Sequence, residues 1–361
     1  MPELVVVAEQ LLAPVPGGTG RYTAELLRAL AHTVPPGWTL SSVVANHRDV
    51  ERARVAGVRG PRVLPVPPRA LVAAWQAGLP LWPGGAAVHA PTPLAPPKAR
   101  RGGTLSVTVH DTVPWTHPGT LTPRGARWHR AVIRRAALRA DALVVPTKAV
   151  ATELAQYVEA CAAVHVIGHG VSELGPPAAM DLPDKYVLAV STIEPRKGID
   201  VLVEAMALLR ASGQQVPLLL AGQPGWGGLD PVRLAREHGL PQDAVRVLGR
   251  VTDAELAAVL RGARVVAAPS LAEGFGLVVL EAMAAGAPVV HSDAPALVEV
   301  AGGAAVVVPR GDARALAASL REVLGSPARA AELAAAGRAR AAEFRWHDAA
   351  RRVWALHADV S

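Results

Sequence analysis

The 361-residue sequence contains a single cysteine, Cys161, so an internal disulfide is excluded and the redox compartment stays open. Aromatic residues make up only 4% of the chain, and no five basic residues follow one another, which argues against a nucleic-acid partner. No apolar run is long enough to span a membrane, and the first residues carry no basic segment typical of a secretory signal. We therefore expect a cytoplasmic protein, with peripheral contact at the inner face of a membrane left open.

The chain has more basic than acidic side chains, 37 against 30, which gives a formal charge of +7. With nucleic acid disfavoured, a charge of this sign fits a polyanionic small molecule or an anionic membrane surface. The helix predicted at residues 124–140 is rich in arginine, but its basic residues fall on several faces. Both a solvated charged helix and a lipid- or anion-binding helix therefore remain open.

Short apolar segments, separated by glycine-bearing loops and helical segments, recur along the chain and are typical of buried strands in parallel α/β sheets. We predict such strands at 4–8, 43–45, 62–66, 87–89, 105–109, 142–146, 164–167, 186–191, 217–221, 265–268, 288–290 and 306–309, and a strand with its following loop at 245–251. The proline-bearing segment 175–184 separates two series of strands and is the predicted linker. The predicted domains are 1–175 and 176–345, followed by a terminal helix at 346–361.

The segment 265–290 predicts a buried strand, a glycine-bearing loop, a helix and a second strand. A strand, a glycine loop and a helix N-terminus together form an anion site, because free N–H groups and the positive end of the helix dipole face the loop. Glu273 lies in this loop, and Glu281 lies about one turn inside the helix. Glu281 either stabilises the helix by its charge or, as a semi-buried acceptor, binds hydroxyl donors such as those of a ribose.

This segment resembles the signature of the retaining nucleotide-sugar glycosyltransferases of family 4. The residues that carry the resemblance are Glu273, Gly274-Phe275-Gly276, Glu281-Ala282-Met283-Ala284 and Gly286-Ala287-Pro288-Val289. The resemblance implies an α/β protein of GT-B architecture, with two Rossmann-like parallel-sheet domains facing each other across a cleft and a terminal helix that packs back on the first. It also implies that Glu281 binds the donor ribose and that Glu273 faces the transferred sugar. Backbone amides near the diphosphate or the sugar hydroxyls would come from Gly274, Phe275, Gly276 and Leu277.

Two adjacent cations, Arg196 and Lys197, follow the strand predicted at 186–191. Cations in a strand-to-helix loop are what a diphosphate leaving group requires, although a basic pair in isolation is often only a surface feature. The Pro-Arg-Lys-Gly context is similar to the donor-pyrophosphate segment of the family. This resemblance implies that both side chains contact the leaving phosphates.

Several other loops resemble those that line the family's cleft. Gly18, in the loop predicted after the first strand, is expected near the donor phosphates or the acceptor, although such a glycine-rich turn is a weak signal alone. Gly222 matches a glycine of the donor side, and the loop that contains Leu248 and Val251 is expected near the nucleobase. His110, beside Asp111, follows a predicted strand at the edge where ligands bind in α/β sheets.

For His110 the resemblance implies contact with the sugar, and a histidine with a purely structural role is the alternative. Arg69, Trp75 and Trp82 either line the acceptor side or pack in the domain interior, and packing is favoured. No cluster with metal-ligand spacing is present, so we expect no metal or other cofactor and assign the role of Mg²⁺ to side-chain cations.

The implied function is retaining transfer of a hexose from a nucleoside-diphosphate sugar to a glycan, lipid-linked or small-molecule acceptor, as in polysaccharide or glycolipid biosynthesis. The His-Asp segment favours GDP-mannose as donor, followed by UDP-glucose or UDP-N-acetylglucosamine. Two alternatives remain open: a nonhydrolysing sugar-nucleotide epimerase of the same fold, and a non-enzymatic protein that binds nucleic acid or lipid.

Overall fold

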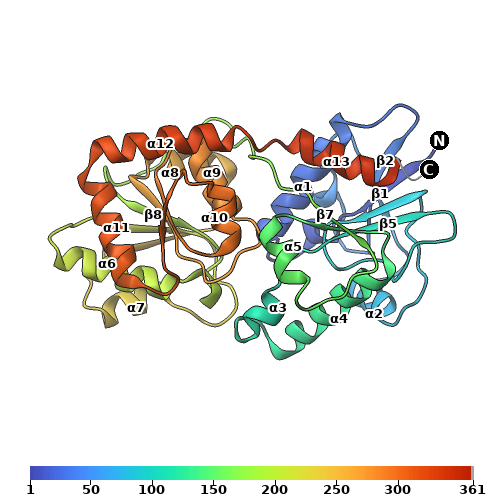
Figure 1. Cartoon of the computed structure of the whole chain (residues 1–361), viewed down its shortest axis with the longest axis horizontal. Helices are drawn as coiled ribbons and strands as arrows, with labels where there is room; N and C mark the ends of the chain where they lie inside the picture. Colours follow the sequence, from blue (N-terminus) through green and yellow to red (C-terminus); the bar gives the residue numbers. More distant parts are fainter. Residues whose placement is uncertain (359–361) are drawn as a thin grey trace. The chain divides into compact units, whose positions relative to one another are not determined.

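The computed structural model describes residues 1–358, which form two compact α/β units (Figure 1). The first unit comprises residues 1–118 and 122–170 and the segment that begins at Arg345, and the second comprises 119–121 and 171–344. The last helix therefore belongs to the same unit as the first strand. Residues 359–361, the end of the predicted terminal helix, lie outside the described residues.

The first unit is built on a seven-stranded parallel sheet of order β3-β2-β1-β4-β5-β6-β7. Its strands are β1 (Glu3–Val7), β2 (Thr39–Val44), β3 (Arg59–Val63), β4 (Ala87–Ala90), β5 (Thr104–Thr108), β6 (Ala142–Val145) and β7 (Ala163–Val166). Its helices are α1 (Gly17–His32), α2 (Pro68–Gln76), α3 (Val113–Thr116), α4 (Pro123–Arg139), α5 (Lys148–Leu154) and α13 (Trp346–Ala358), with 3-10 turns η1 (Glu9–Leu12) and η2 (Glu51–Ala53). The 3-10 turn η3 (Pro118–Thr120) begins in this unit, and its other two residues belong to the second. Leu4 of β1 pairs with Leu40 of β2 and with Ala87 of β4, which sets the parallel register at the centre of the sheet.

Helices cover both faces of this sheet, which explains why its central strands read as continuous apolar runs. On one face, Leu71 of α2, Ile133 of α4 and Leu154 of α5 share a buried core with alternate residues of the strands. On the other face, α1 and α13 pack against each other, as Figure 1 also shows. Trp354 of α13 is buried there, and its indole N–H donates to the carbonyl oxygen of Leu30 at 3.2 Å.

A buried polar ladder runs along the α13 face of β5. His357 of α13 lies with Nδ1 2.8 Å from Thr104 Oγ1 and with Nε2 2.8 Å from Ser106 Oγ. Ser106 Oγ is in turn 2.8 Å from Nδ1 of His89, whose Nε2 is 3.4 Å from Thr108 Oγ1. Burial lowers the pKa of His357 to about 4. Burial, together with the nearby His357 and His110, lowers the pKa of His89 to about 3. Both imidazoles are therefore neutral at physiological pH.

The second unit contains a six-stranded parallel sheet of order β10-β9-β8-β11-β12-β13. Its strands are β8 (Val187–Val190), β9 (Leu218–Ala221), β10 (Val245–Gly249), β11 (Val265–Ala268), β12 (Val289–Ser292) and β13 (Val306–Val308). Its helices are α6 (Ile199–Ala211), α7 (Pro231–Glu237), α8 (Asp253–Gly262), α9 (Leu277–Ala285), α10 (Pro295–Ala301), α11 (Ala313–Gly325) and α12 (Pro327–Ala341), with the 3-10 turn η4 (Pro195–Lys197). Val187 and Ala189 of β8 share a core with α6, α7 and α11, whereas Leu188 between them packs with α8, α9 and α10.

Both sheets have the strand order of a doubly wound fold, because the fourth strand of each unit pairs with the first on the side away from the second. The predicted α/β class with two Rossmann-like parallel sheets is confirmed, and each predicted strand has a counterpart in the described chain. One local expectation differs. Helix α1 begins at Gly17, so Gly18 lies in its first turn and not in a preceding loop. The proline- and tryptophan-rich segment after β3 contains α2, which opens with Pro68 at a position where proline favours a helix start.

Candidate functional site

The two predicted acid and cation motifs come together at the carboxyl edge of the second sheet. Strands β8 and β11 are neighbours there, although one follows the other by more than seventy residues of sequence. The loop 191–198 follows β8, and the loop 269–276 follows β11. This pair of strands is the topological switch point of the unit, where open α/β sheets bind their ligands.

Backbone contacts hold these two loops together. Gly198 ends the η4 turn with a φ of +64°, and a Cβ at this position would lie 2.3 Å from the carbonyl oxygen of Pro269. Only glycine therefore permits both the left-handed backbone and the close approach. The N–H of Leu271 also donates to the carbonyl oxygen of Arg196 at 2.8 Å, so a second backbone contact joins the two loops.

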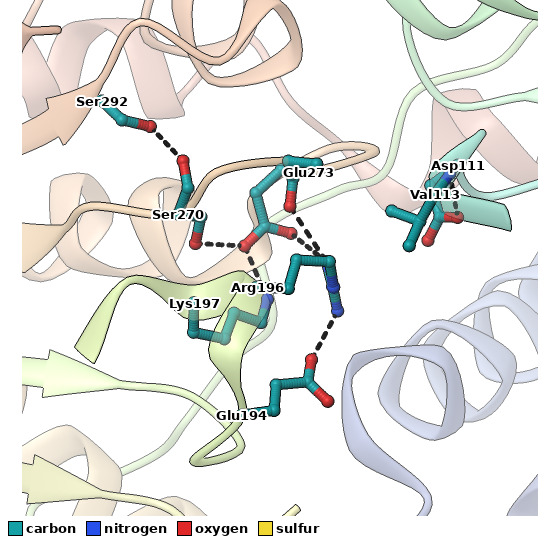
Figure 2. Close-up of polar contacts among 9 residues, drawn as sticks. Asp111, Val113, Glu194, Arg196, Lys197, Ser270, Glu273 and Ser292 are labelled. Carbon is teal, nitrogen blue, oxygen red and sulfur yellow. Dashed lines mark hydrogen bonds and ion pairs between the residues drawn. The ribbon is translucent and has the colours of Figure 1, made fainter. Parts of the chain in front are cut away.

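Glu273 lies at the centre of a compact network of ion pairs (Figure 2). Its Oε1 accepts hydrogen bonds from Lys197 Nζ at 2.6 Å and from the Ser270 hydroxyl at 2.8 Å. Its Oε2 lies 3.5 Å from Nη1 of Arg196, whose Nη2 donates to Glu194 Oε1 at 2.8 Å. The structure thus brings Arg196, Lys197 and Glu273 together, as a shared site requires.

The network fixes the charge of Glu273. Burial by itself would raise the pKa of this carboxyl group, but the charges of Lys197 and Arg196 and the hydrogen bonds from Lys197 and Ser270 outweigh burial and lower it to about 2. For Lys197, burial and the neighbouring guanidinium lower the pKa, and Glu273 opposes this effect. The 2.6 Å contact identifies the two side chains as an ion pair, so the site presents a carboxylate at neutral pH.

Helix α9 begins at the end of the same loop. The helix begins after Gly276, whose φ is +91°, and Glu281 lies buried within it, 4% exposed. The Phe275 side chain packs in the core of the unit beside Phe344, with ring centroids 5.8 Å apart. In this packing, Phe275 can contact a ligand only through its backbone. A backbone contact is also what the resemblance implied for this residue.

The remaining donor-side candidates follow neighbouring strands at this edge. Gly222 follows β9, and its N–H donates to the carbonyl oxygen of Gly249 at 2.8 Å. Leu248 lies at the end of β10, and Val251 follows it, both partly buried against the core. Their contact with a nucleobase stays a prediction.

Sequence analysis did not find three polar residues that support the loop of Glu273. Glu194 pairs with Arg196, Ser270 donates to Glu273, and the Ser292 hydroxyl at the end of β12 donates to the carbonyl oxygen of Ser270 at 2.5 Å (Figure 2). Glu194 could have been noticed, because it lies two residues before Arg196 in the same loop. The serines carry no pattern of their own.

In the first unit, His110 lies just beyond β5 and is held by a specific hydrogen bond. Its Nε2 is 2.8 Å from the carbonyl oxygen of Pro91. A carbonyl oxygen only accepts, so Nε2 carries the proton and Nδ1 is left as an acceptor. Burial lowers the pKa of His110, and the Pro91 carbonyl and the charge of Asp111 oppose this effect only in part. Asp111 itself accepts from the N–H of Val113, the first residue of α3, at 3.1 Å (Figure 2).

His110 belongs to a cluster of aromatic rings around Tyr22 of α1. The Tyr22 ring centroid lies 4.7 Å from that of His110, 4.5 Å from that of His169 and 5.9 Å from that of Trp346. The Tyr22 hydroxyl is 3.2 Å from Thr108 Oγ1, so the cluster joins the buried polar ladder of β5. Sequence analysis did not predict this cluster, because its members come from four separate segments.

The predicted acceptor-side residues divide between exterior and interior. Gly18 and Arg69 are exposed. Trp75 is 2% exposed within the core, and its indole N–H donates to the carbonyl oxygen of Leu81 at 2.9 Å. Trp82 packs against the same core. Packing is therefore the role that the structure supports for both tryptophans.

Within the described residues 1–358, no three or more His, Cys, Asp or Glu side chains are grouped so that they could hold a metal ion. In the same part of the chain, no helix combines the length and apolar character needed to cross a membrane.

Comparison with known families assigns both units. Residues 16–173 match the model of Glycosyltransferase Family 4, and residues 176–340 match that of Glycosyl transferases group 1. The chain is 33% identical over 276 residues to the MMP alpha-(1->4)-mannosyltransferase of Mycolicibacterium hassiacum, an alignment that covers 72% of this chain and 66% of that protein. It is 37% identical over 164 residues to the O-antigen chain mannosyltransferase B of Escherichia coli, covering 45% of this chain and 43% of that protein. The chain thus spans less than half of the latter relative.

Comparison with solved structures supports the fold. Sucrose-phosphate synthase from Thermosynechococcus elongatus superposes with a TM-score of 0.77 and 23% identity, over 99% of this chain and 98% of that one. At this identity the likeness concerns the fold. The two family models, the mannosyltransferase relative aligned over 72% of this chain and the intact Glu273 to Val289 signature show that the chain belongs to the family 4 glycosyltransferases, whose GT-B architecture it shares.

Proposed function

We propose that this protein transfers a hexose from a nucleoside-diphosphate sugar to a glycan, lipid-linked or small-molecule acceptor with retention of anomeric configuration. The observation that supports the proposal most strongly is the Lys197–Glu273 ion pair of 2.6 Å at the switch point of the second sheet. A partly buried cation and a partly buried carboxylate, side by side near a helix N-terminus, match the two ends of a nucleotide sugar. The cation suits its diphosphate, and the carboxylate suits its hydroxyl groups.

In this proposal the second unit stabilises the negative charge of the leaving diphosphate. The ammonium group of Lys197 and the N-terminus of α9 stabilise the charge that grows on the departing diphosphate, which is usually the largest electrostatic contribution to such a reaction. Glu273, ionised at neutral pH, accepts hydrogen bonds from sugar hydroxyls, and Glu281 accepts those of the ribose. The departing phosphate takes the proton of the acceptor hydroxyl, so no protein nucleophile is needed.

GDP-mannose is the proposed donor, and a UDP-hexose is the second choice. The two curated relatives compared with this chain are both named as mannosyltransferases, which supports mannose as the transferred sugar. In the first unit, the acceptor Nδ1 of His110 offers a partner for a sugar hydroxyl hydrogen. Transfer is proposed to need no metal ion, since Lys197 supplies positive charge where Mg²⁺ would otherwise act.

A thermal-shift and calorimetric series tests donor binding. GDP, GDP-mannose, UDP, UDP-glucose and UDP-N-acetylglucosamine are each added to the wild type, to Lys197→Met and to Lys185→Met. Lys185 is an exposed lysine of the same unit and serves as the matched control. A ligand at a hundred times its Kd stabilises a protein by about 2.7 kcal/mol, so the preferred donor should raise the wild-type and Lys185→Met midpoints clearly. A wild type that binds none of the five compounds contradicts the proposal.

A turnover assay then tests the reaction. With a donor that binds, removal of the Lys197 charge should raise the transition-state free energy by about 2 to 4 kcal/mol, which corresponds to about a thirtyfold to a thousandfold loss of kcat/KM. Activity that persists in EDTA supports metal independence, and an α-linked product seen by NMR supports retention. Release of an altered nucleotide sugar without any acceptor would instead indicate the epimerase alternative.

Peripheral contact with an anionic membrane is proposed for the exposed face of α4. That face carries Arg124, Arg127, Arg134 and Arg139 together with Leu138, which is 55% exposed, and the helix has no acidic residue. Basic and apolar side chains on one helix face suit phospholipid headgroups. Co-sedimentation with vesicles of phosphatidylglycerol, but not of phosphatidylcholine, is expected for the wild type and should be lost in Arg127→Glu/Arg134→Glu. Equal sedimentation of both proteins would contradict this part of the proposal.

A further inference from the structure

Arg196 and Lys197 are adjacent in sequence, but their side chains have different surroundings. The Arg196 guanidinium donates through Nη1 to the carbonyl oxygen of Ala272 at 3.0 Å and through Nη2 to Glu194 at 2.8 Å, and it lies 3.5 Å from Glu273. Its backbone carbonyl accepts from Leu271. Both the side chain and the backbone of Arg196 are therefore bound to the loop that carries Glu273, and Figure 2 shows the side-chain contacts.

Lys197 is bound far less. Among the described residues, its Nζ makes one hydrogen bond, to Glu273 Oε1 at 2.6 Å. An ammonium group has three donors, so two of its N–H groups stay available for a ligand. The compact ammonium can also turn toward a phosphate while it keeps its stem in place, whereas a planar guanidinium that bridges several acceptors cannot turn without breaking the bridge.

Moving Arg196 onto a phosphate would have a cost that moving Lys197 would not. Side chains of Glu194 and Arg196 are only 19% and 18% exposed, so Glu194 would lose the partner of a largely buried carboxylate. The carbonyl oxygen of Ala272 would lose its donor as well, and the loop before Glu273 would lose the contact that fixes it. Glu194 in turn holds the guanidinium from the side opposite that loop, as Figure 2 shows.

From these contacts we propose that Arg196 and Lys197 have different roles, an inference that rests on the proposed glycosyl transfer. Arg196 and Glu194 are positioning residues that hold the Glu273 carboxylate where it meets the sugar, and Lys197 is the cation that contacts the leaving diphosphate. Sequence analysis gave Arg196 and Lys197 the same role. Direct contact between Arg196 and the phosphates is thus the competing outcome that an experiment must separate from positioning.

The test separates the diphosphate from the sugar by using GDP and GDP-mannose as two probes, with UDP and UDP-glucose in their place if the wild type prefers uridine. Calorimetry gives the Kd of each probe, and GDP released from GDP-mannose gives kcat and KM. The variants are Arg196→Gln, Arg196→Lys, Glu194→Gln and Lys197→Met. Arg233→Gln is the matched control, because Arg233 forms an exposed ion pair with Glu237 elsewhere in the second unit.

If Arg196 is a positioning residue, Arg196→Gln and Arg196→Lys keep the Kd for GDP within about threefold of the wild type but lower kcat at saturating donor by at least tenfold. Glu194→Gln has an effect of the same kind. The double variant Glu194→Gln/Arg196→Gln is no worse than the more impaired single variant, because both residues belong to the same set of contacts. Lys197→Met weakens GDP binding by at least tenfold. Arg233→Gln resembles the wild type.

If Arg196 contacts the phosphates, different Kd values for GDP are expected. Arg196→Gln would then weaken GDP binding by tenfold or more, Arg196→Lys would restore much of it because the charge is kept, and Glu194→Gln would tighten it by freeing the guanidinium. Any of these results overturns the inference. If Arg196→Gln does not fold, Arg196→Lys and Glu194→Gln still separate the two roles. A wild type that binds neither GDP nor UDP would refute the proposed function itself, whereas loss of GDP binding only in Arg196→Gln refutes this assignment alone.

Discussion

The neutral histidines of the buried polar ladder should make the first unit sensitive to acid. His357 is 1% exposed, and burial lowers its pKa to about 4, whereas an unfolded chain has a histidine pKa of about 6.5. Between these two values the unfolded state binds the proton more readily than the folded state. The stabilisation is therefore fully present above pH 6.5 and is lost as the pH falls toward 4.

The size of the effect follows from the same two values. Each pKa unit corresponds to about 1.4 kcal/mol, so acidification from pH 6.5 to 4.5 should remove about 2 kcal/mol through His357 alone. His89, with a pKa of about 3, contributes a similar slope over the same range. Replacing His357 by glutamine, which does not titrate, should therefore halve the slope that these two residues produce.

Urea unfolding at four pH values between 7.5 and 4.5, followed by tryptophan fluorescence, measures this slope. The signal reports mainly on the first unit, since seven of the eight tryptophans, all except Trp226, belong to it. The comparison is between the wild type, His357→Gln and His347→Gln. His347 is an exposed histidine on the same helix, so its replacement should leave the pH dependence unchanged. If His357→Gln loses stability below pH 6.5 as steeply as the wild type, the reasoning about burial is refuted.

Three further predictions concern the second unit and are checked by urea unfolding together with GDP binding. Gly222→Ala would place a methyl group 1.7 Å from the carbonyl oxygen of Ser191, so we expect a loss of at least about 2 kcal/mol; an unchanged midpoint would show that the loops separate freely. Thr252→Ala removes the capping box of α8 and should cost about 1 kcal/mol while GDP binding is retained. Tyr186→Phe removes the buried hydrogen bond from the Tyr186 hydroxyl to the carbonyl oxygen of Val259, 2.8 Å, and should cost about 1 to 2 kcal/mol; no loss would mean that the carbonyl finds another donor.

Sequence patterns predicted the framework of both sheets because parallel strands buried on two faces must be apolar at every position. The runs at 186–191, 217–221 and 265–268 are of this kind, and each contains a strand. The pattern was less informative where helices are short and open with proline. Helix α2, in the segment rich in proline and tryptophan, was not predicted, although its Trp75 was correctly favoured as a packing residue.

The candidate site was predictable only where a motif is continuous in sequence. The loop of Glu273 and the pair Arg196 and Lys197 were found in this way, and the sheet order explains why they meet. Glu194 was not singled out, because its significance depends on the direction in which the Arg196 guanidinium points. That direction is set by the carbonyl oxygen of Ala272, which lies in a loop of another strand. Such a contact exists only after the fold has formed.

The position of α13 has a consequence for biosynthesis. Trp346, Trp354 and His357 complete the interior of a unit whose other parts are encoded in the first 170 residues. A ribosome releases the entire second unit before it releases these side chains. During translation, the apolar surface of α1 and the polar face of β5 therefore stay uncovered until α13 is made, and in that period the nascent chain is exposed to chaperones and proteases. Transplanting the α13 segment ahead of β1 would remove that delay.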